Sequence, residues 1–227
     1  MNNNYSISQA TSLFISKVYG WMALGLSITG LVAFYTANSP YMINLLFGTP
    51  GLLMVLMLVN FALVISLSAA IHKISTTTAQ MAFIAYSALT GLTLSSVFLV
   101  YTMSSIAVVF FLAAAMFGAM ALYGHFTQAD LSEMGSALTM CLFGIILSSF
   151  VNMFLQNSAF DYALSFFGVI VFTLLTAYDA QKIKMLAHAA STHEDATKLS
   201  ITGALTLYLD FINLFLYLLK FMGKKRD

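Results

Sequence analysis

Residues 206–220 read Thr206-Leu-Tyr-Leu-Asp210-Phe-Ile-Asn213-Leu-Phe-Leu-Tyr217-Leu-Leu-Lys220, a carboxylate inside an apolar run long enough to help cross a membrane. The polar residues of this run are spaced by 4, 3, 4 and 3 positions, so on a helix they form one polar stripe. A charged group at the centre of a bilayer costs at least about 2.5–3.5 kcal/mol. Membrane proteins that retain such a group generally use it to handle ions or protons. The stripe therefore predicts a functional transmembrane helix around Asp210.

The composition of the whole chain indicates a membrane protein. Of its 227 residues, 60% are hydrophobic and 7% are charged, and the mean hydropathy is +0.91. Soluble domains carry about 25% charged residues, so a soluble globular fold is excluded. Apolar runs of roughly 20 residues recur along the chain, as in polytopic helical membrane proteins. The net charge of +1 gives no basic surface for nucleic acid, and the single cysteine, Cys141, allows no disulfide within the chain.

The apolar runs predict an all-α protein with seven transmembrane helices. We expect the spans at about 18–37, 51–71, 80–101, 104–124, 135–155, 162–181 and 199–222. Residues 1–16 are then a cytoplasmic N-terminal segment without the features of a removable signal peptide. Residues 17–222 form one seven-helix transmembrane domain, and residues 223–227 form a short basic tail.

The distribution of lysines predicts a cytoplasmic N-terminus. With that orientation, Lys17, Lys73, Lys182, Lys184 and Lys198 all lie on the cytoplasmic side, and the opposite loops contain no Lys or Arg. The basic tail disagrees, because seven full spans place it outside. Either the tail tolerates this position, or the last segment is re-entrant. We favour a full span, since residues 199–222 are long enough to cross.

Few ionisable groups remain inside the predicted spans. Asp210 lies about 16–18 Å along the seventh span at 1.5 Å per residue, and Asp179 ends the sixth span. Each has an ordinary structural alternative, since Asp210 could make a passive polar contact and Asp179 could cap a helix. If the two carboxyl groups met, their protonation would be coupled, as in a pH sensor. Such a contact requires the seventh helix to start deep or the sixth to tilt.

Two lysines and four histidines complete the set. Lys73 closes the second span and has the ordinary alternative of a positive-inside anchor, whereas Lys220 lies near the outer end of the seventh span and can extend to the interface. The histidines show no metal-site spacing. The chain has no Ser–His arrangement, no His-Glu-x-x-His motif and no phosphate-binding glycine loop, so we expect neither an enzyme nor a resident cofactor.

Five separated motifs give the chain a resemblance to a known family. They are Val18-Tyr-Gly-Trp-Met, Tyr86-Ser-Ala-Leu-Thr-Gly-Leu-Thr-Leu-Ser-Ser, Met116-Phe-Gly-Ala-Met-Ala-Leu-Tyr-Gly, the run from Gly168 through Ala-Tyr-Asp179-Ala-Gln-Lys182, and Gly203-Ala-Leu-Thr-Leu-Tyr-Leu-Asp210-Phe-Ile-Asn213. In this order and spacing the chain resembles the Bax inhibitor (transmembrane Bax inhibitor motif) family over residues 17–222. The similarity is greatest to the bacterial inner-membrane branch of that family.

The resemblance implies a fold, a function and a set of roles. The implied fold has the seventh helix at the centre, wrapped by the other six, in the bacterial inner membrane. The implied function is a pH-sensitive calcium leak, in which Asp179 and Asp210 form the sensor and gate and give passing calcium a transient site. Lys73 takes the place of the family's basic latch, although a lysine cannot clamp a carboxylate through two donors as an arginine does. Thr206, Asn213 and Tyr217 are expected to line the pore.

Other functions stay open at this stage. A proton-coupled cation exchanger would use the same acids, although no broken-helix pair with inverted symmetry is evident. A non-transporting regulator of a membrane protease or stress pathway is the third possibility. The partners expected under these hypotheses are the lipid bilayer, calcium ions, protons and another membrane protein.

Overall fold

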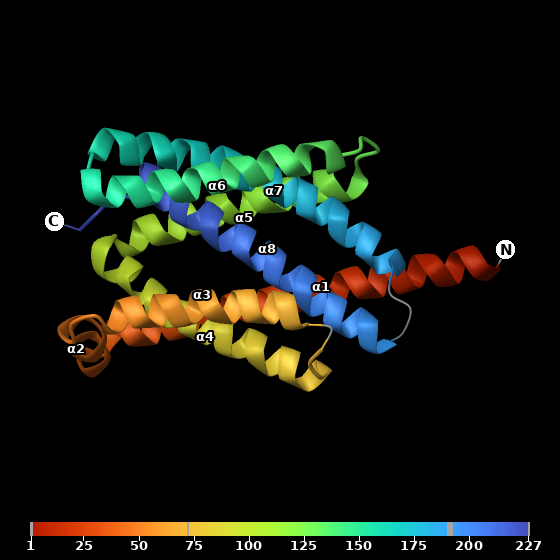
Figure 1. Ribbon diagram of the computed structural model, residues 1–227, viewed down its shortest axis with the longest axis horizontal. Coiled ribbons are helices and arrows are strands. Elements are labelled where there is room, and N and C mark those ends of the chain that lie inside the picture. Colours follow the sequence, from red (N-terminus) through yellow and green to blue (C-terminus); the bar gives the residue numbers. More distant parts are fainter. Residues whose placement is uncertain (1, 72, 190–192, 227) are drawn as a thin grey trace. The chain divides into compact units, whose positions relative to one another are not determined.

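The computed structural model describes residues 2–71, 73–189 and 193–226, and these residues form helices connected by short turns (Figure 1). Seven helices are long and apolar enough to cross a membrane, which confirms the predicted all-α class and the predicted number of spans. The helices are α1 (Asn2–Asn38), α2 (Pro40–Gly48), α3 (Leu52–Ala70), α4 (Thr76–Val100), α5 (Met103–Phe126), α6 (Ser132–Leu155), α7 (Ser158–Ala189) and α8 (His193–Met222).

Helix α7 extends past residue 181, the predicted end of the sixth span, so Asp179 lies within the helix and does not cap it. The membrane boundary near Asp179 stays a prediction. The helix continues to Ala189, and two of its lysines contact neighbouring groups. The Nζ atom of Lys182 lies 5.7 Å from the centre of the Tyr178 ring. The Nζ atom of Lys184 donates to the carbonyl oxygen of His125 at 3.0 Å. Helix α8 likewise begins several residues before the predicted start of the seventh span.

Helix α2 occupies a segment that the sequence analysis treated as a loop. Its first turn is capped by Ser39, whose Oγ accepts a hydrogen bond from the amide of Met42 at 3.4 Å. Pro40 stands at the first helical position, where its lack of an N–H group costs no hydrogen bond. Ser39-Pro40 is therefore a common helix start. Leu46 is buried, whereas Tyr41 is 74% exposed. The helix is therefore short, with Leu46 buried against the protein and Tyr41 exposed.

The contacts within the chain divide it into two compact units. The first contains the chain through Tyr101 together with Leu186–Leu205, and the second contains Thr102–Met185 together with Thr206–Lys225. Helix α8 is therefore shared, and Asp179 and Asp210 both belong to the second unit. The central position of the last helix in the membrane stays a prediction.

In the first unit, α1 packs along α4 and α3 packs on the other side of α4 (Figure 1). The contact with α1 is close at Gly91, where an added Cβ would lie 2.7 Å from the carbonyl oxygen of Thr29. The Thr29 hydroxyl donates to the carbonyl oxygen of Ser87 at 2.8 Å, and the Asn60 amide donates to the Thr90 hydroxyl at 2.9 Å. Small residues and interhelical hydrogen bonds are the usual means of helix association in lipid.

In the second unit, α5 and α7 pack against the C-terminal part of α8. The Phe211 ring on α8 meets the edges of the Phe110 and Phe117 rings on α5, with centroids 5.5 and 5.6 Å apart. Gly124 on α5 lies directly against the backbone of Ala177 on α7. These contacts hold the helices that carry the two aspartates.

Candidate functional site

The side chains of Asp179 and Asp210 are hydrogen-bonded to each other, one from α7 and one from α8. Their exposed fractions are 8% and 5%, so the aspartate pair is shielded by protein. Two carboxyl groups can share a hydrogen bond only if one of them carries the proton. Both residues are predicted site residues, and the structure brings them into contact.

The register between α7 and α8 explains why the two aspartates meet. The helices run antiparallel, and Phe172, seven positions before Asp179, stacks on Tyr217, seven positions after Asp210. The stacked rings have centroids 5.6 Å apart and planes 22° apart. A Cβ added at Gly168 would lie 2.5 Å from the same tyrosine ring, so the helices approach closely there. This packing fixes the register that places the carboxyl groups together.

One carboxyl oxygen of the pair has no hydrogen-bond partner among the described residues. Thr176, one turn before Asp179, is fully buried, and its hydroxyl donates to the Phe172 carbonyl of its own helix at 2.8 Å. The Oδ2 atom of Asp210 is buried and has no hydrogen-bond partner within the described part of the chain. Leaving a buried polar atom unpaired costs about 1–3 kcal/mol. The site therefore retains capacity for a proton or a cation.

The positive charge beside the pair comes from a residue that the sequence analysis did not assign. Lys182, one turn after Asp179 on α7, contributes the positive charge in the electrostatic surroundings of Asp179. Lys73, the predicted latch, is exposed in the turn after α3 and belongs to the first unit. The role of Lys73 stays a prediction.

The predicted pore-lining residues occupy different environments on α8. Thr206 and Asn213 are half-buried, and the Asn213 amide donates to the Leu209 carbonyl of its own helix at 2.8 Å. The Tyr217 ring is packed on Phe172, and its hydroxyl is hydrogen-bonded to that of Ser149 on α6. Tyr217 therefore fills the space between helices. Its role in a pore, like that of the other two, stays a prediction.

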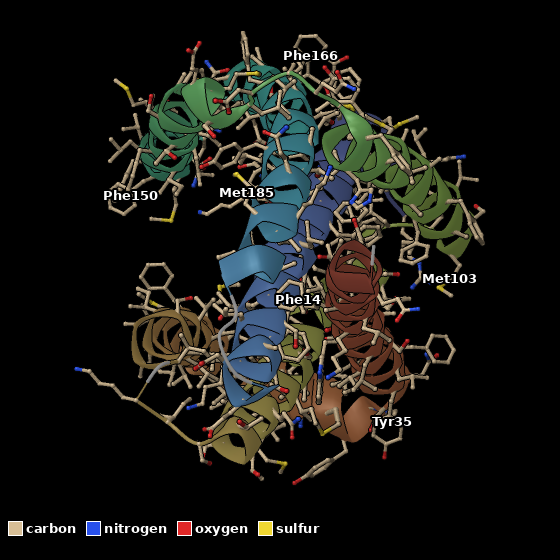
Figure 2. The ribbon with its side chains drawn as sticks, turned by 90° about the vertical axis from the view of Figure 1, so that its right-hand side faces the viewer. Phe14, Tyr35, Met103, Phe150, Phe166 and Met185 are labelled. Atoms are coloured by element: carbon tan, nitrogen blue, oxygen red, sulfur yellow. The ribbon has the colours of Figure 1, made fainter. Side chains whose placement is uncertain are left out.

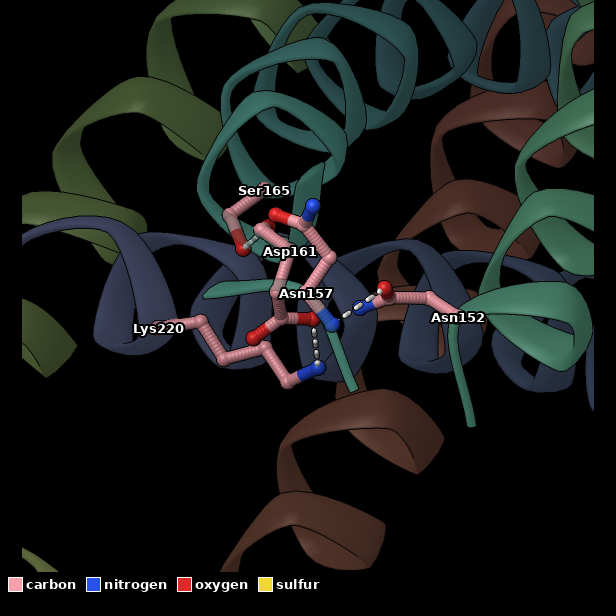
Figure 3. A network of polar contacts seen from close by, with 5 residues as sticks. All are labelled: Asn152, Asn157, Asp161, Ser165 and Lys220. Atoms are coloured by element: carbon pink, nitrogen blue, oxygen red, sulfur yellow. Dashed lines mark hydrogen bonds and ion pairs between the residues drawn. The ribbon is translucent and has the colours of Figure 1, made fainter. Parts of the chain in front are cut away.

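A polar network lies where α6 ends, α7 begins and α8 ends (Figure 3). The Nζ atom of Lys220 lies 3.2 Å from Oδ1 of Asp161. Each residue sits where the helix dipole favours its charge, the acid in the first turn of α7 and the base in the last turn of α8. The sequence analysis placed Lys220 near a helix end and assigned it no partner. The antiparallel order of the two helices is the signal that would have suggested Asp161.

The connection between α5 and α6 is fastened to α7 beside the aspartate pair. The side chain of Gln181 accepts from the amide of Leu131 at 2.9 Å and donates to the carbonyl oxygen of Ala129 at 2.8 Å. The oxygen and the nitrogen of the Gln181 side chain thereby hold the α5–α6 connection against α7, the helix that carries Asp179. Nothing in the sequence pattern had singled out this glutamine.

The described residues contain no group of three or more His, Cys, Asp or Glu side chains that would hold a metal ion. Calcium prefers six to eight oxygen ligands. The two aspartates therefore differ from a resident calcium site, and other oxygen atoms would have to complete any calcium coordination.

The comparisons with known proteins identify the family. The model of the family described as inhibitor of apoptosis-promoting Bax1 matches residues 11–227. The inner membrane protein YbhL of Escherichia coli strain K12 is 52% identical over 215 residues, covering 94% of this chain and 92% of YbhL. An uncharacterized protein of Borreliella burgdorferi is 44% identical over 94% of this chain and 93% of its own length. The chain is a membrane protein of seven apolar helices and belongs to the Bax inhibitor family.

Proposed function

We propose that the protein is a pH-sensitive calcium leak of a bacterial inner membrane, gated by protonation of the aspartate pair. The observation that carries the proposal is the buried hydrogen bond between Asp179 and Asp210, together with the unpaired oxygen of Asp210. A proton shared by two acids holds the two helices together. When that proton leaves, two buried negative charges face each other, and the closed packing loses this hydrogen bond between α7 and α8.

Calcium is the proposed ion because carboxylate oxygens are the ligands that it prefers. The pair gives a passing ion two carboxylates at most, so water and backbone carbonyls supply the remaining ligands. Weak, incomplete coordination suits passage, since an ion that is held by a full set of ligands leaves slowly. The proposal thus treats calcium as the transported ion and assigns the protein no resident cofactor and no enzymatic activity.

Helix packing converts the protonation change into a change of state. Asp210 lies next to Phe211, whose ring is enclosed by α5, so a displacement of the carboxyl group shifts a packed aromatic cluster. Packed interfaces switch between discrete arrangements more readily than they deform continuously. Lys182 lies one turn after Asp179 on α7, and the proposed role of Lys73 as latch is a separate part of this hypothesis.

The test is calcium entry into liposomes that carry the purified protein and a calcium dye, recorded from pH 5 to 8. We expect a pH-dependent leak in the wild type and a flattened pH response in Asp179→Asn and in Asp210→Asn. Glu133→Gln removes an exposed carboxylate in the first turn of α6 and should keep the wild-type response. No flux above that of empty liposomes at any pH would eliminate the leak, and a search for a membrane-protein partner by cross-linking would follow.

A second dye separates the leak from an exchanger. With a pH dye inside the same liposomes, a passive leak moves calcium without a stoichiometric proton counterflow. A proton gradient that drives calcium against its own gradient would show exchange instead. Both functions use the aspartate pair, so the aspartate variants alone do not distinguish them.

A further inference from the structure

A pocket of about 380 Å³ opens at the end of the second unit where α6, α7 and α8 meet (Figure 3). Its wall includes Asn152 from the last turn of α6, Gln156 and Asn157 from the α6–α7 turn, and Asp161 and Lys220 from the helix ends. The pocket is thus polar, although the spans around it are apolar. It is separate from the aspartate pair, because Lys220 lies ten residues, or about 15 Å of helix, beyond Asp210.

The pocket presents one positive and one negative group side by side. The side chains of Lys220 and Asp161 are 49% and 46% exposed, so both retain donors and acceptors for a further partner. An ion pair this accessible contributes little to folding stability, typically about 0–1 kcal/mol. The two side chains therefore suit a ligand that carries one positive and one negative group. Such a ligand replaces the Lys220–Asp161 ion pair by two ion pairs, one with each side chain.

A buried amide in the pocket wall has unused hydrogen-bonding capacity. Asn152 is only 9% exposed, and its Oδ1 accepts from the amide of Asn157 at 3.1 Å. Its Nδ2 donor has no acceptor within the described part of the chain. Together with Lys220 and the positive end of the α7 helix dipole, this donor forms a region suited to an anionic oxygen. The Asp161 carboxylate provides the matching acceptor for an ammonium group.

The surface beside the pocket is apolar. The last two turns of α6 carry exposed apolar side chains, and Phe150 on α6 and Phe166 on α7 project away from the helices (Figure 2). The exposed fractions are 60% for Phe150, 60% for Met153, 70% for Phe154 and 65% for Leu155. A polar pocket bordered by exposed aromatic and aliphatic groups matches a molecule with a charged head and apolar chains.

We propose that this pocket binds the phosphoethanolamine head group of a membrane phospholipid, with its ammonium on Asp161, its phosphate on Lys220 and Asn152, and its acyl chains along α6. An ammonium has three N–H donors for the carboxylate, whereas the trimethylammonium of a choline lipid has none. A glycerol head group has no positive charge for Asp161. The site therefore selects among lipids by head-group chemistry, and it does so independently of ion conduction.

The test is native mass spectrometry of the detergent-purified protein with added phosphatidylethanolamine, phosphatidylcholine or phosphatidylglycerol of the same acyl chains. We expect the wild type to prefer phosphatidylethanolamine over phosphatidylcholine by about tenfold, the value of one charge-assisted hydrogen bond. Asp161→Asn should abolish that preference. Lys220→Gln should weaken the binding of phosphatidylethanolamine and of phosphatidylcholine by a similar factor. Glu133→Gln should bind all three lipids as the wild type does.

Three results would overturn the proposal. One is equal binding of the ethanolamine and choline lipids by the wild type, and another is an unchanged preference in Asp161→Asn. The third is full displacement of the lipid by soluble glycerophosphoethanolamine at the lipid's own concentration, which would assign the pocket to a soluble zwitterion. If Asp161→Asn fails to fold, as judged by size-exclusion chromatography, the wild-type lipid comparison and Lys220→Gln decide the question.

Discussion

The ring of Tyr217 stacks on the ring of Phe172, with centroids 5.6 Å apart, seven residues along each helix from the aspartate pair. The stack occupies the space between α7 and α8 on the side of the pair that leads to Lys220. Under the proposed leak, an ion that moves from the pair between α7 and α8 towards this end would meet the two rings. Changing the size of the side chain at position 217 is therefore a direct test of the proposed conduction path.

Substitution of Tyr217 should therefore change the proposed leak according to the volume removed. Tyr217→Ala deletes the ring, and we expect a raised calcium flux at neutral pH in the liposome assay. Tyr217→Phe keeps the stack and loses only the hydrogen bond to Ser149, so its flux should stay close to that of the wild type. Equal flux in the alanine and phenylalanine variants would show that the stack does not restrict the path.

The contact between Gly124 and Ala177 should make α5 intolerant of a methyl group at one glycine. Gly124→Ala places a Cβ against the backbone of α7, and overpacking of this kind costs about 1–3 kcal/mol. We expect a clear loss of thermal stability in detergent. Gly118→Ala on the same helix is the matched control, because an added Cβ there meets no atom within 4 Å. A Gly124→Ala protein as stable as the control would contradict the close approach.

The side chain of Gln181 should protect the backbone amide of Leu131 from hydrogen–deuterium exchange. Gln181→Glu keeps an oxygen that accepts from the Leu131 amide, whereas Gln181→Met removes both hydrogen bonds to the α5–α6 connection. Hydrogen–deuterium exchange at Leu131 should therefore stay slow in the glutamate variant and become fast in the methionine variant. Fast exchange in both variants would mean that the amide nitrogen of Gln181, which bonds Ala129, is the group that holds the loop.

Asp130 should give the start of α6 a stability that depends on pH. Its Oδ1 accepts from the amide of Ser132 at 2.9 Å, and hydrogen bonds from the backbone and side chain of Ser132 hold the pKa of Asp130 below its ordinary value. A lowered pKa stabilises the fold above the unfolded value of about 3.9, and this contribution disappears as the pH falls through the lower folded value.

Thermal unfolding of Asp130→Ala and of wild type from pH 3 to 7 measures this effect. The alanine variant should melt below the wild type at pH 7, and the gap should be constant down to about pH 5 and shrink below the unfolded pKa of about 3.9. Asp130→Asn keeps a capping oxygen without the charge, so its melting temperature should depend less on pH. A gap that widens on acidification would have the wrong sign for a lowered pKa.

The sequence predicted the membrane class, the seven spans and the identity of the two acids, because hydropathy and buried charge are properties of single segments. The residue pattern alone left open whether Asp179 and Asp210 touch, and only the family resemblance implied that they pair, because contact depends on the register between α7 and α8. Two lysines after Asp179 suggested a membrane boundary. Helix α7 continues past both lysines, with Lys182 over the Tyr178 ring of the same helix and Lys184 donating to the His125 carbonyl on α5.

Other parts of the site depended on long-range geometry that no local pattern encodes. Asp161 and Lys220 are 59 positions apart, and only the antiparallel arrangement of two helices pairs them. The two hydrogen bonds from Gln181 to the α5–α6 turn likewise join residues that are far apart in the sequence. Helix α2 is different, since Ser39 and Pro40 form a recognisable helix start that the sequence analysis passed over.

The hydrogen bond from Thr29 to Ser87 sets a condition on how the protein is made. The two residues are 58 positions apart, so α1 emerges from the ribosome roughly 3–12 s before its partner at 5–20 residues per second. During that interval α1 and the following hairpin reside in the membrane without the surface that α4 later provides. The packing of α1 thus waits for α4, and a ribosome stalled before Ser87 leaves α1 without its main helix partner in the first unit.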